Sequence, residues 1–429
     1  MNLALLVDHR PVAARFTGRL LESCGYRVVL VPSLDRAVEE ARRHVPGVVL
    51  CYADLARAEK FPVLRRLRQL LGSHGRVLLL LPAPSRAAAA AAPPAGADDV
   101  LREPLTREKL LAALPPVTAG ESGLPARLRF WGVRGSIPTP GRSTVRYGGN
   151  TSCVEVRAGP EILILDAGTG LRMLGRHLRE EFGDRPLSLT ILLTHTHWDH
   201  IQGLPFFAPL YEPRHRVRIL GCKGARRGLR TVLNHQMESP FFPVGLPDLP
   251  ANVTIEEFPG STFTLGPVRV TVTRANHPGL CVGYRLTVGN RSLVYLPDNE
   301  PHGRKHRLQR HSGAPPSHDT AFVEQADAQL TEFCRGAEVL ILDAQYDCQE
   351  YQQRVGWGHG CVDDAVGLAL AAGVRRLFLF HHDPDHDDAQ IDALTAHARA
   401  LVKAQGGRLH VAAAREGREL VWAPAAGLR

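Results

Sequence analysis

The sequence predicts an α/β protein of two units, and three observations lead to this fold class. Residues 1–115 alternate short apolar runs with amphipathic stretches five times, a pattern typical of a doubly wound parallel sheet. Residues 116–126 are rich in Pro, Gly and small polar residues without periodicity, which indicates a linker. Residues 127–429 contain further apolar strand candidates, several of which lead directly into His or Asp.

Length and composition limit the class of protein. A chain of 429 residues can form two or three domains. It has no apolar run near the ~20 residues that a membrane span needs, and its first residues lack the pattern of a signal peptide. Its eight cysteines are scattered, without a CxxC pair. We therefore expect a cytoplasmic protein with reduced thiols and no membrane partner.

The net charge of +9 is weak support for a nucleic-acid partner. Residues 1–115 hold 17 Lys and Arg against 11 Asp and Glu, so most of the excess lies in the first unit. A diffuse charge of this kind favours phosphate contacts only in general terms.

The first unit is predicted from its alternating segments. The apolar runs are Leu3–Val7, Arg27–Val31, Val48–Tyr52, Val77–Leu81 and Val100–Leu101. The helix candidates are Ala13–Ser23, Asp35–Arg43, Val63–Leu71, Arg86–Ala92 and Arg107–Ala113. This order resembles a response-regulator receiver domain, which implies a flavodoxin-like sheet.

The receiver resemblance has departures at the residues that carry its chemistry. Asp8 matches the start of the acidic pocket, but Tyr52 stands where the family has its phosphoacceptor aspartate, and Glu103 replaces the usual lysine. We interpret the unit as a pseudo-receiver for docking a signalling partner or forming a homodimer. The alternative is phosphorylation of Asp54 after a shift in register.

The second unit contains a cluster of metal-ligand side chains. An apolar run, Leu187–Leu193, reads as a buried strand and is followed by Thr194–His200. His195 and His197 lie two residues apart, so an extended backbone points both imidazoles the same way. Asp199 and His200 follow where the chain must turn. The cluster predicts two adjacent metals that share one loop.

Other strand candidates also end in ligand side chains. Glu161–Leu165 leads to Asp166, which could orient a ligand loop or cap the helix that starts near Leu171. Three further strands, Val268–Thr273, Ser292–Leu296 and Arg376–Phe380, lead to His277, Asp298 and His381 respectively. Three such endings are unlike the isolated core or cap histidines of most proteins.

These motifs give a family resemblance. Residues 127–422 resemble the metallo-β-lactamase-fold hydrolases, in the branch near ribonuclease Z and bacterial phosphodiesterases. The matching segments are Phe130–Ser136, Tyr147–Ser152, the Asp166 turn, His195–His200, Asn276–Pro278, Asp298, Asp343–Tyr346 and His381–Pro384. The resemblance implies an αββα sandwich with the metals at the shared edge of two sheets.

The resemblance also implies roles for individual residues. The first metal would bind His195, His197 and His277, the second Asp199, His200 and His381, with Asp298 bridging. Supporting or substrate-contacting roles fall to Asn150, Asp166, Trp198 and Asp343. Imidazole-rich ligands favour Zn²⁺, with Mn²⁺ or Fe²⁺ as alternatives.

The predicted activity is attack on a phosphodiester by a metal-bridging hydroxide. Asp199 or Asp298 would accept a proton, and His359 would donate one to the leaving oxygen, unless His359 is only a loop residue before the helix Val362–Ala371. We expect small phosphodiesters such as cyclic nucleotides as substrates. The alternatives are a lactone, thioester or other carboxylic ester, an RNA-processing nuclease, or a signalling scaffold with a structural metal site.

Two segments bear on the choice of substrate. Leu204–Pro250 shows no long Gly/Pro/basic arm of the ribonuclease Z kind, which lowers the expectation of tRNA processing. The basic run His302–His311 is expected to be a solvated loop, with phosphate contact as the alternative. Trp198 and the pair Phe241-Phe242 are candidates for lining a small pocket or for the core.

Overall fold

The protein is described here by a computed structural model. It describes residues 2–24, 26–43, 46–52, 61–71, 75–82, 96–106, 109–110, 113–114, 126–222, 228–239, 241–258, 260–311 and 320–423. The chain forms two compact units, Met1–Ser122 and Gly123–Arg429. Asp54, the helix candidate Arg86–Ala92 and linker residues 116–125 lie outside the described residues, while Ala126 begins a strand.

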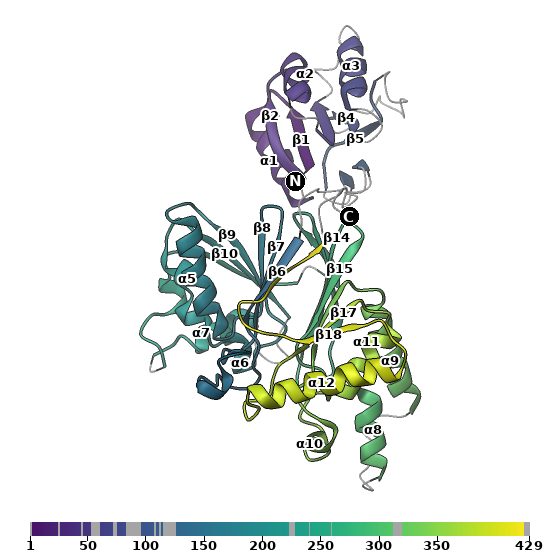
Figure 1. Ribbon diagram of the computed structural model, residues 1–429. Coiled ribbons are helices and arrows are strands. Elements are labelled where there is room, and N and C mark those ends of the chain that lie inside the picture. The colour runs from purple at the N-terminus through teal and green to yellow at the C-terminus, as the bar shows by residue number, and fades with distance from the viewer. Residues whose placement is uncertain are drawn as a thin grey trace. The chain divides into compact units, whose positions relative to one another are not determined.

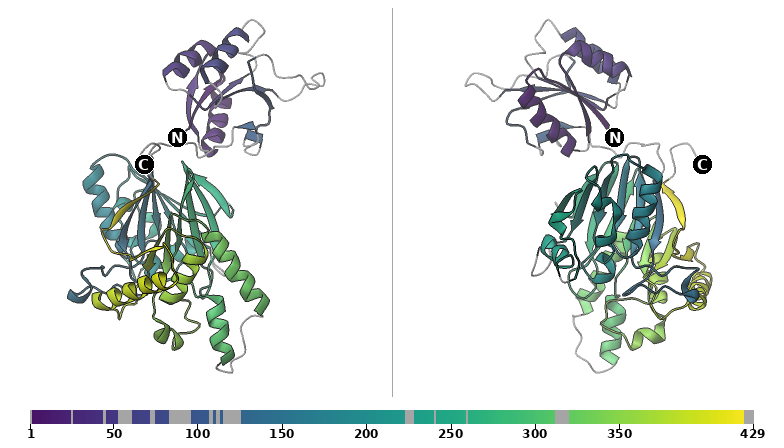
Figure 2. Two further views of the ribbon diagram at one scale, coloured as in Figure 1. Left: turned by 45° about the vertical axis from the view of Figure 1, so that its right-hand side comes forward. Right: turned by 90° about the vertical axis from the view of Figure 1, so that its left-hand side faces the viewer.

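The first unit is a parallel sheet in the order β2-β1-β3-β4-β5. Its strands are β1 (Asn2–Val7), β2 (Tyr26–Val31), β3 (Val48–Tyr52), β4 (Arg76–Leu81) and β5 (Asp99–Arg102). The helices α2 (Leu34–Arg43) and α3 (Phe61–Leu71) bury their apolar residues against one face, and α1 (Pro11–Ser23) against the other (Figure 2). The prediction of a doubly wound sheet is confirmed.

The pocket at the strand ends of this unit is filled by an arginine. Tyr52 is the last residue of β3 and is buried. The Arg10 guanidinium donates to both carboxylate oxygens of Asp8, each at 3.1 Å, and to Glu103 at 3.3 Å. Its central carbon lies 3.2 Å from the centroid of the Tyr52 ring. An internal cation therefore occupies the space between the two acids.

We expect acetyl phosphate to leave this unit unmodified. The described strand end offers a phenol where an acyl phosphate needs a carboxylate, and Arg10 already pairs with Asp8. Intact-mass measurement after incubation with acetyl phosphate and Mg²⁺ should show no phosphate adduct. An adduct on an aspartate of this unit would contradict the pseudo-receiver interpretation.

The second unit packs two seven-stranded sheets face to face, as Figure 1 shows. The first sheet has the order β11-β10-β9-β8-β7-β6-β19 and the second β12-β13-β14-β15-β16-β17-β18. The first comprises β6 (Ala126–Gly132), β7 (Cys153–Ala158), β8 (Glu161–Leu165), β9 (Ser188–Leu192), β10 (Arg216–Gly221), β11 (Asn252–Glu257) and β19 (Glu419–Ala423). The second comprises β12 (Thr262–Leu265), β13 (Val268–Arg274), β14 (Val282–Val288), β15 (Arg291–Leu296), β16 (Val339–Asp343), β17 (Arg376–Phe380) and β18 (His410–Ala413).

Three apolar layers hold this sandwich together. One core lies between the sheets, where Phe130 meets Phe378 and Tyr284 is fully buried. A second lies under α5 (Gly170–Phe182) and α7 (Leu229–His235) on the first sheet. A third lies under α9 (Thr320–Cys334), α11 (Val362–Ala371) and α12 (Asp388–Ala404) on the second. The predicted αββα arrangement is confirmed.

The basic run His302–His311 is a helix, α8, so the prediction of a solvated loop is wrong. Arg, Lys, Leu and Gln, which have good helix propensity, make up most of its sequence, and Gly303 donates its backbone N–H to Asp327 at 2.9 Å. Arg304 pairs with Asp364 of α11. Among the described helices, none combines the length and apolar character of a membrane span.

Candidate metal centre

The carboxyl ends of strands from both sheets meet at the candidate site. β9 of the first sheet leads through Leu193 and Thr194 into the short helix α6 (Trp198–Ile201). In the second sheet, β13, β15 and β17 lead to His277, Asp298 and His381. Strands separated by up to about 180 residues thus bring their terminal side chains to one edge of the sandwich.

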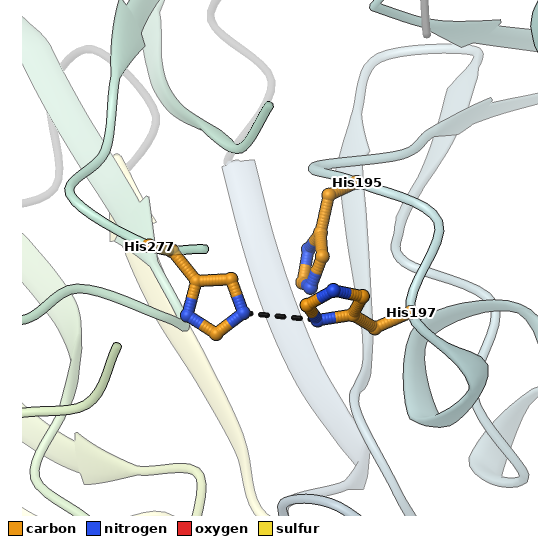
Figure 3. A group of neighbouring side chains, drawn as sticks. All are labelled: His195, His197 and His277. Carbon is orange, nitrogen blue, oxygen red and sulfur yellow. Dashed lines mark hydrogen bonds between the residues drawn. The ribbon is translucent and has the colours of Figure 1, made fainter. Parts of the chain in front are cut away.

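Three imidazoles form the first group of predicted ligands. His195, His197 and His277 can place one nitrogen each within 4.8 Å of one another. Figure 3 shows His277 facing the two histidines of the β9 loop. Its Nε2 lies 2.9 Å from His197 Nδ1, and the two nitrogens share a hydrogen bond (Figure 3).

Asp199, His200 and His381 form a second group by the same measure. Asp199 Oδ2 lies 3.3 Å from His200 Nε2 and 3.1 Å from His381 Nε2. The backbone N–H of Ser136 also donates to Asp199 Oδ2, at 2.8 Å. The Ser136 N–H therefore fixes the Asp199 carboxylate, and the same oxygen, Oδ2, faces both imidazoles.

Asp298 lies between the two groups. Its Oδ2 is 3.7 Å from His195 Nε2 and 3.6 Å from His277 Nε2. Its Oδ1 is 3.1 Å from His200 Nε2 and 3.5 Å from His381 Nε2. Each carboxylate oxygen thus faces one group, as a bridging ligand requires.

The donor set fits a pair of divalent metals. Among the described residues, His195 Nε2, His200 Nε2 and Asp298 Oδ1 are buried polar atoms without a hydrogen-bond partner. Such atoms are costly unless something binds them. Burial lowers the pKa of His195 and lowers that of His277 to about 4, which keeps both imidazoles neutral, the form that binds metal.

Asp166 orients the ligand loop. Its carboxylate accepts hydrogen bonds from Thr194 N at 2.8 Å, His200 Nδ1 at 2.8 Å and Tyr295 OH at 2.9 Å. A bond to Nδ1 leaves Nε2 of His200 free for a metal. The helix α5 is instead preceded by Thr169 as its N-cap, so the helix-cap alternative for Asp166 is wrong.

His381 is held in place by a series of hydrogen bonds that the sequence did not reveal. Its Nδ1 lies 3.0 Å from Oε1 of Gln345, whose Nε2 donates to Asp383 at 3.1 Å. Gly135 packs so close to the His381 ring that a Cβ there would lie 2.3 Å from Nδ1. Gln345 belongs to the segment Asp343–Tyr346, which is one of the segments that carry the family resemblance. This was the feature of the sequence that could have pointed to its contact with His381.

His359 is buried beside the centre rather than exposed on a loop. Its Nδ1 lies 2.8 Å from Asp343 Oδ2, and its ring stacks on His381 with centroids 4.7 Å apart. Burial opposes protonation, but the Asp343 carboxylate outweighs it and raises the pKa of His359 to about 9. Asp343 thus positions a histidine that carries a proton near neutral pH.

The remaining predicted residues lie farther out. Asn150 donates from N and Nδ2 to Glu416, at 2.6 and 3.0 Å, and so fixes its own loop. Trp198 is 73% exposed at the start of α6, and Trp357, which precedes the Gly358 carbonyl bonded to His277 Nδ1, is 61% exposed. Phe241 is exposed and Phe242 packs against Phe206.

Comparison with known proteins points to one superfamily. Residues 162–315 match the family model described as the beta-lactamase superfamily domain. Ribonuclease Z of Thermoplasma volcanium is 24% identical over 298 residues, which are 64% of this chain and 92% of that protein. Ribonuclease BN of Salmonella paratyphi C is also 24% identical, over 65% of this chain and 95% of its own length.

One solved structure to which the chain is similar is the metallo-beta-lactamase fold protein YhfI from Bacillus subtilis. It is 19% identical, with a TM-score of 0.49, and the similarity covers 69% of this chain and 99% of that protein.

Proposed function

We propose that the second unit, of which residues 162–315 match the beta-lactamase superfamily domain, is a dinuclear metal-dependent phosphodiesterase with the metallo-β-lactamase fold. The observation that carries this proposal is the convergence of two ligand groups on Asp298, with three buried donor atoms left unbonded. A purely structural site would close its coordination with protein ligands. The observed arrangement, with one carboxylate between two groups, instead suits two metals that share a substrate.

The surrounding residues supply orientation and proton transfer. When bound, two divalent metals would polarise the phosphodiester and lower the pKa of a water between them. Asp199 and Asp298 hold acceptor oxygens at this position, and His359 holds a proton that it can donate to the leaving oxygen. Zn²⁺ is the metal that the imidazole-rich donor set favours.

The exposed tryptophans support a nucleotide-containing substrate. Trp198 follows His197 and Trp357 precedes the Gly358 carbonyl that binds His277, so both residues are next in sequence to residues of the candidate centre. Trp198 and Trp357 are 73% and 61% exposed, so both indoles are accessible to a ligand. Indole rings stack on nucleic-acid bases of any sequence. Together with the ribonuclease relatives, this favours RNA over lactones and thioesters, with cyclic nucleotides as the second candidate.

The proposal is tested by metal content and substrate choice. The purified chain should contain two metals and should cleave bis(p-nitrophenyl) phosphate until a chelator removes them. A short RNA with a 3′ trailer, a 3′,5′-cyclic nucleotide and an acyl lactone should then be compared at equal concentration. Cleavage of a diester but not of the lactone is the expected result. Hydrolysis of the lactone alone, or a chain that binds no metal, would contradict the proposal.

We expect W198A and W357A to weaken substrate binding without disturbing the metals. Loss of one base–indole stack, worth about 1–3 kcal/mol, should raise KM for RNA by roughly 5- to 150-fold. Turnover of methyl p-nitrophenyl phosphate, which has no base, should serve as the control. Trp131 and Trp422 are only 8% and 0% exposed, so quenching of tryptophan fluorescence by RNA should come from the two exposed indoles. Unchanged KM in both variants would refute a stacking role.

For the first unit we propose a docking or dimerisation role. The Arg10 guanidinium that joins Asp8 to Glu103 and covers Tyr52 supports a fixed conformation that needs no phosphorylation. Sedimentation of the full chain, compared with R10A, tests whether self-association depends on this pocket. A monomer that captures no partner would argue against the proposal.

A further inference from the structure

A basic groove lies away from the candidate metal centre. It has a volume of about 350 Å³ and is formed where the terminal strands of the two sheets, β18 and β19, approach each other. Its lining side chains include Arg375, Arg376, Arg408, Arg418, His410 and Glu419. Arg376 is the first residue of β17, whereas His381 follows the last one. The groove and the metal centre therefore lie at opposite ends of this strand, whose position beside β18 is visible in Figure 1.

The carboxylates near this groove are already engaged. Glu419, the acidic residue in its lining, accepts from Arg127 at 3.3 Å. Glu416 in the adjoining loop accepts the two hydrogen bonds from Asn150. Glu338 is shared by three guanidinium groups, those of Arg291, Arg375 and Arg376. Each acid thus has at least one cationic or amide partner, and Glu338 already pairs with two arginines of the groove, Arg375 and Arg376.

Two arginines of the groove have no acidic partner within the described part of the chain. In that part, neither Arg408 nor Arg418 forms an ion pair with a carboxylate. The Arg418 guanidinium instead lies over the Phe378 ring, 4.9 Å from its centroid. Burial, followed by the neighbouring charges of Arg415, Arg399 and Arg376, lowers the pKa of Arg418. Like charges gathered in one groove repel one another, and a bound anion would reduce this repulsion.

We propose that this groove binds a chain of phosphate groups. Guanidinium groups donate paired N–H bonds in a planar fork that matches phosphate oxygens, and several forks in one groove match several linked phosphates. The aromatic ring in the lining, Phe378, is 1% exposed and offers no face for a base. Recognition therefore rests on phosphate rather than on base identity. The phosphates belong either to a free polyphosphate or to the backbone of an RNA.

The proposal is independent of catalysis and is tested by binding to the full, metal-loaded chain. Calorimetry with inorganic tripolyphosphate, supplied as its Mg²⁺ complex to protect the bound metals, covers the first source. Anisotropy of a labelled 2′-O-methyl RNA, which resists cleavage, covers the second. The variant is R408Q/R418Q. The control is R36Q/R335Q, which removes two exposed arginines that each pair with a glutamate three residues away.

R408Q/R418Q should bind tripolyphosphate or RNA at least about tenfold more weakly than the control variant. It should keep its turnover of bis(p-nitrophenyl) phosphate, which would show an intact fold and metal centre. If RNA is the ligand, the slope of log K against log salt should also flatten by roughly 1.4, about 0.7 for each lost phosphate contact. A loss confined to tripolyphosphate would identify a free polyphosphate. Equal affinities of both variants for both probes would overturn the proposal.

Discussion

Replacing Asp298 by asparagine should abolish hydrolysis while leaving the fold intact. Each oxygen of this carboxylate faces one ligand group, at 3.1 to 3.7 Å from four imidazole nitrogens. D298N keeps the shape but removes the charge that offsets repulsion between two cations. A loss of several kcal/mol in transition-state stabilisation, at 1.36 kcal/mol per tenfold, predicts a fall in kcat/KM on the order of 10³-fold. Metal analysis should give fewer than two ions per chain.

A matched control separates this effect from a general change in charge. Asp184 carries a fully exposed side chain that pairs with Arg214 and is not one of the predicted ligands, so D184N makes the same substitution outside the centre. It should retain both metals and full turnover. Circular dichroism should show the same secondary structure in both variants. Two bound metals and ordinary activity in D298N would remove Asp298 from the bridging position.

That these His and Asp side chains gather at one place could be predicted in part because it depends on local geometry. His195 and His197 follow a strand, and the two-residue spacing places both imidazoles on one side of an extended chain. His277, Asp298 and His381 likewise follow strands, and these three strands run in the same direction in one sheet, so their ends come to one edge. The doubly wound sheet of the first unit follows from the alternation of apolar segments with amphipathic helices, whereas the sandwich of the second unit was implied by the family resemblance of residues 127–422.

The residues that orient the ligands depend on contacts between distant segments, and sequence patterns do not contain these. Asp166 could equally have capped a helix, and only its approach to Thr194 and His200 decides between the two roles. α8 was expected to be a loop because its charge suggested solvent exposure. The contact of Arg304 with Asp364, sixty residues along the chain, helps to anchor it as a helix.

D166N should both destabilise the fold and weaken the second metal position. Asp166 has a positive φ of 60°, a conformation that asparagine also adopts, so the backbone need not move. The carboxylate accepts from four donors, whereas an amide presents N–H to at least one of them. An amide N–H placed against a buried hydrogen-bond donor leaves both groups unsatisfied, which should lower the free energy of unfolding by about 3 kcal/mol. Chemical denaturation of the metal-free chain measures this loss.

The effect of D166N on metal binding follows from the proton on His200. An amide that donates to Nδ1 requires that nitrogen to be unprotonated, which moves the proton to Nε2, the atom that faces Asp199 and Asp298. Metal affinity at this position should fall by about 10- to 100-fold. Y295F is the matched control, because it removes a different donor to the same Oδ2 and leaves the His200 bond in place. It should lose stability but keep its metal affinity. If Y295F loses metal as strongly as D166N, the role of Asp166 is to support the core rather than to set the His200 tautomer.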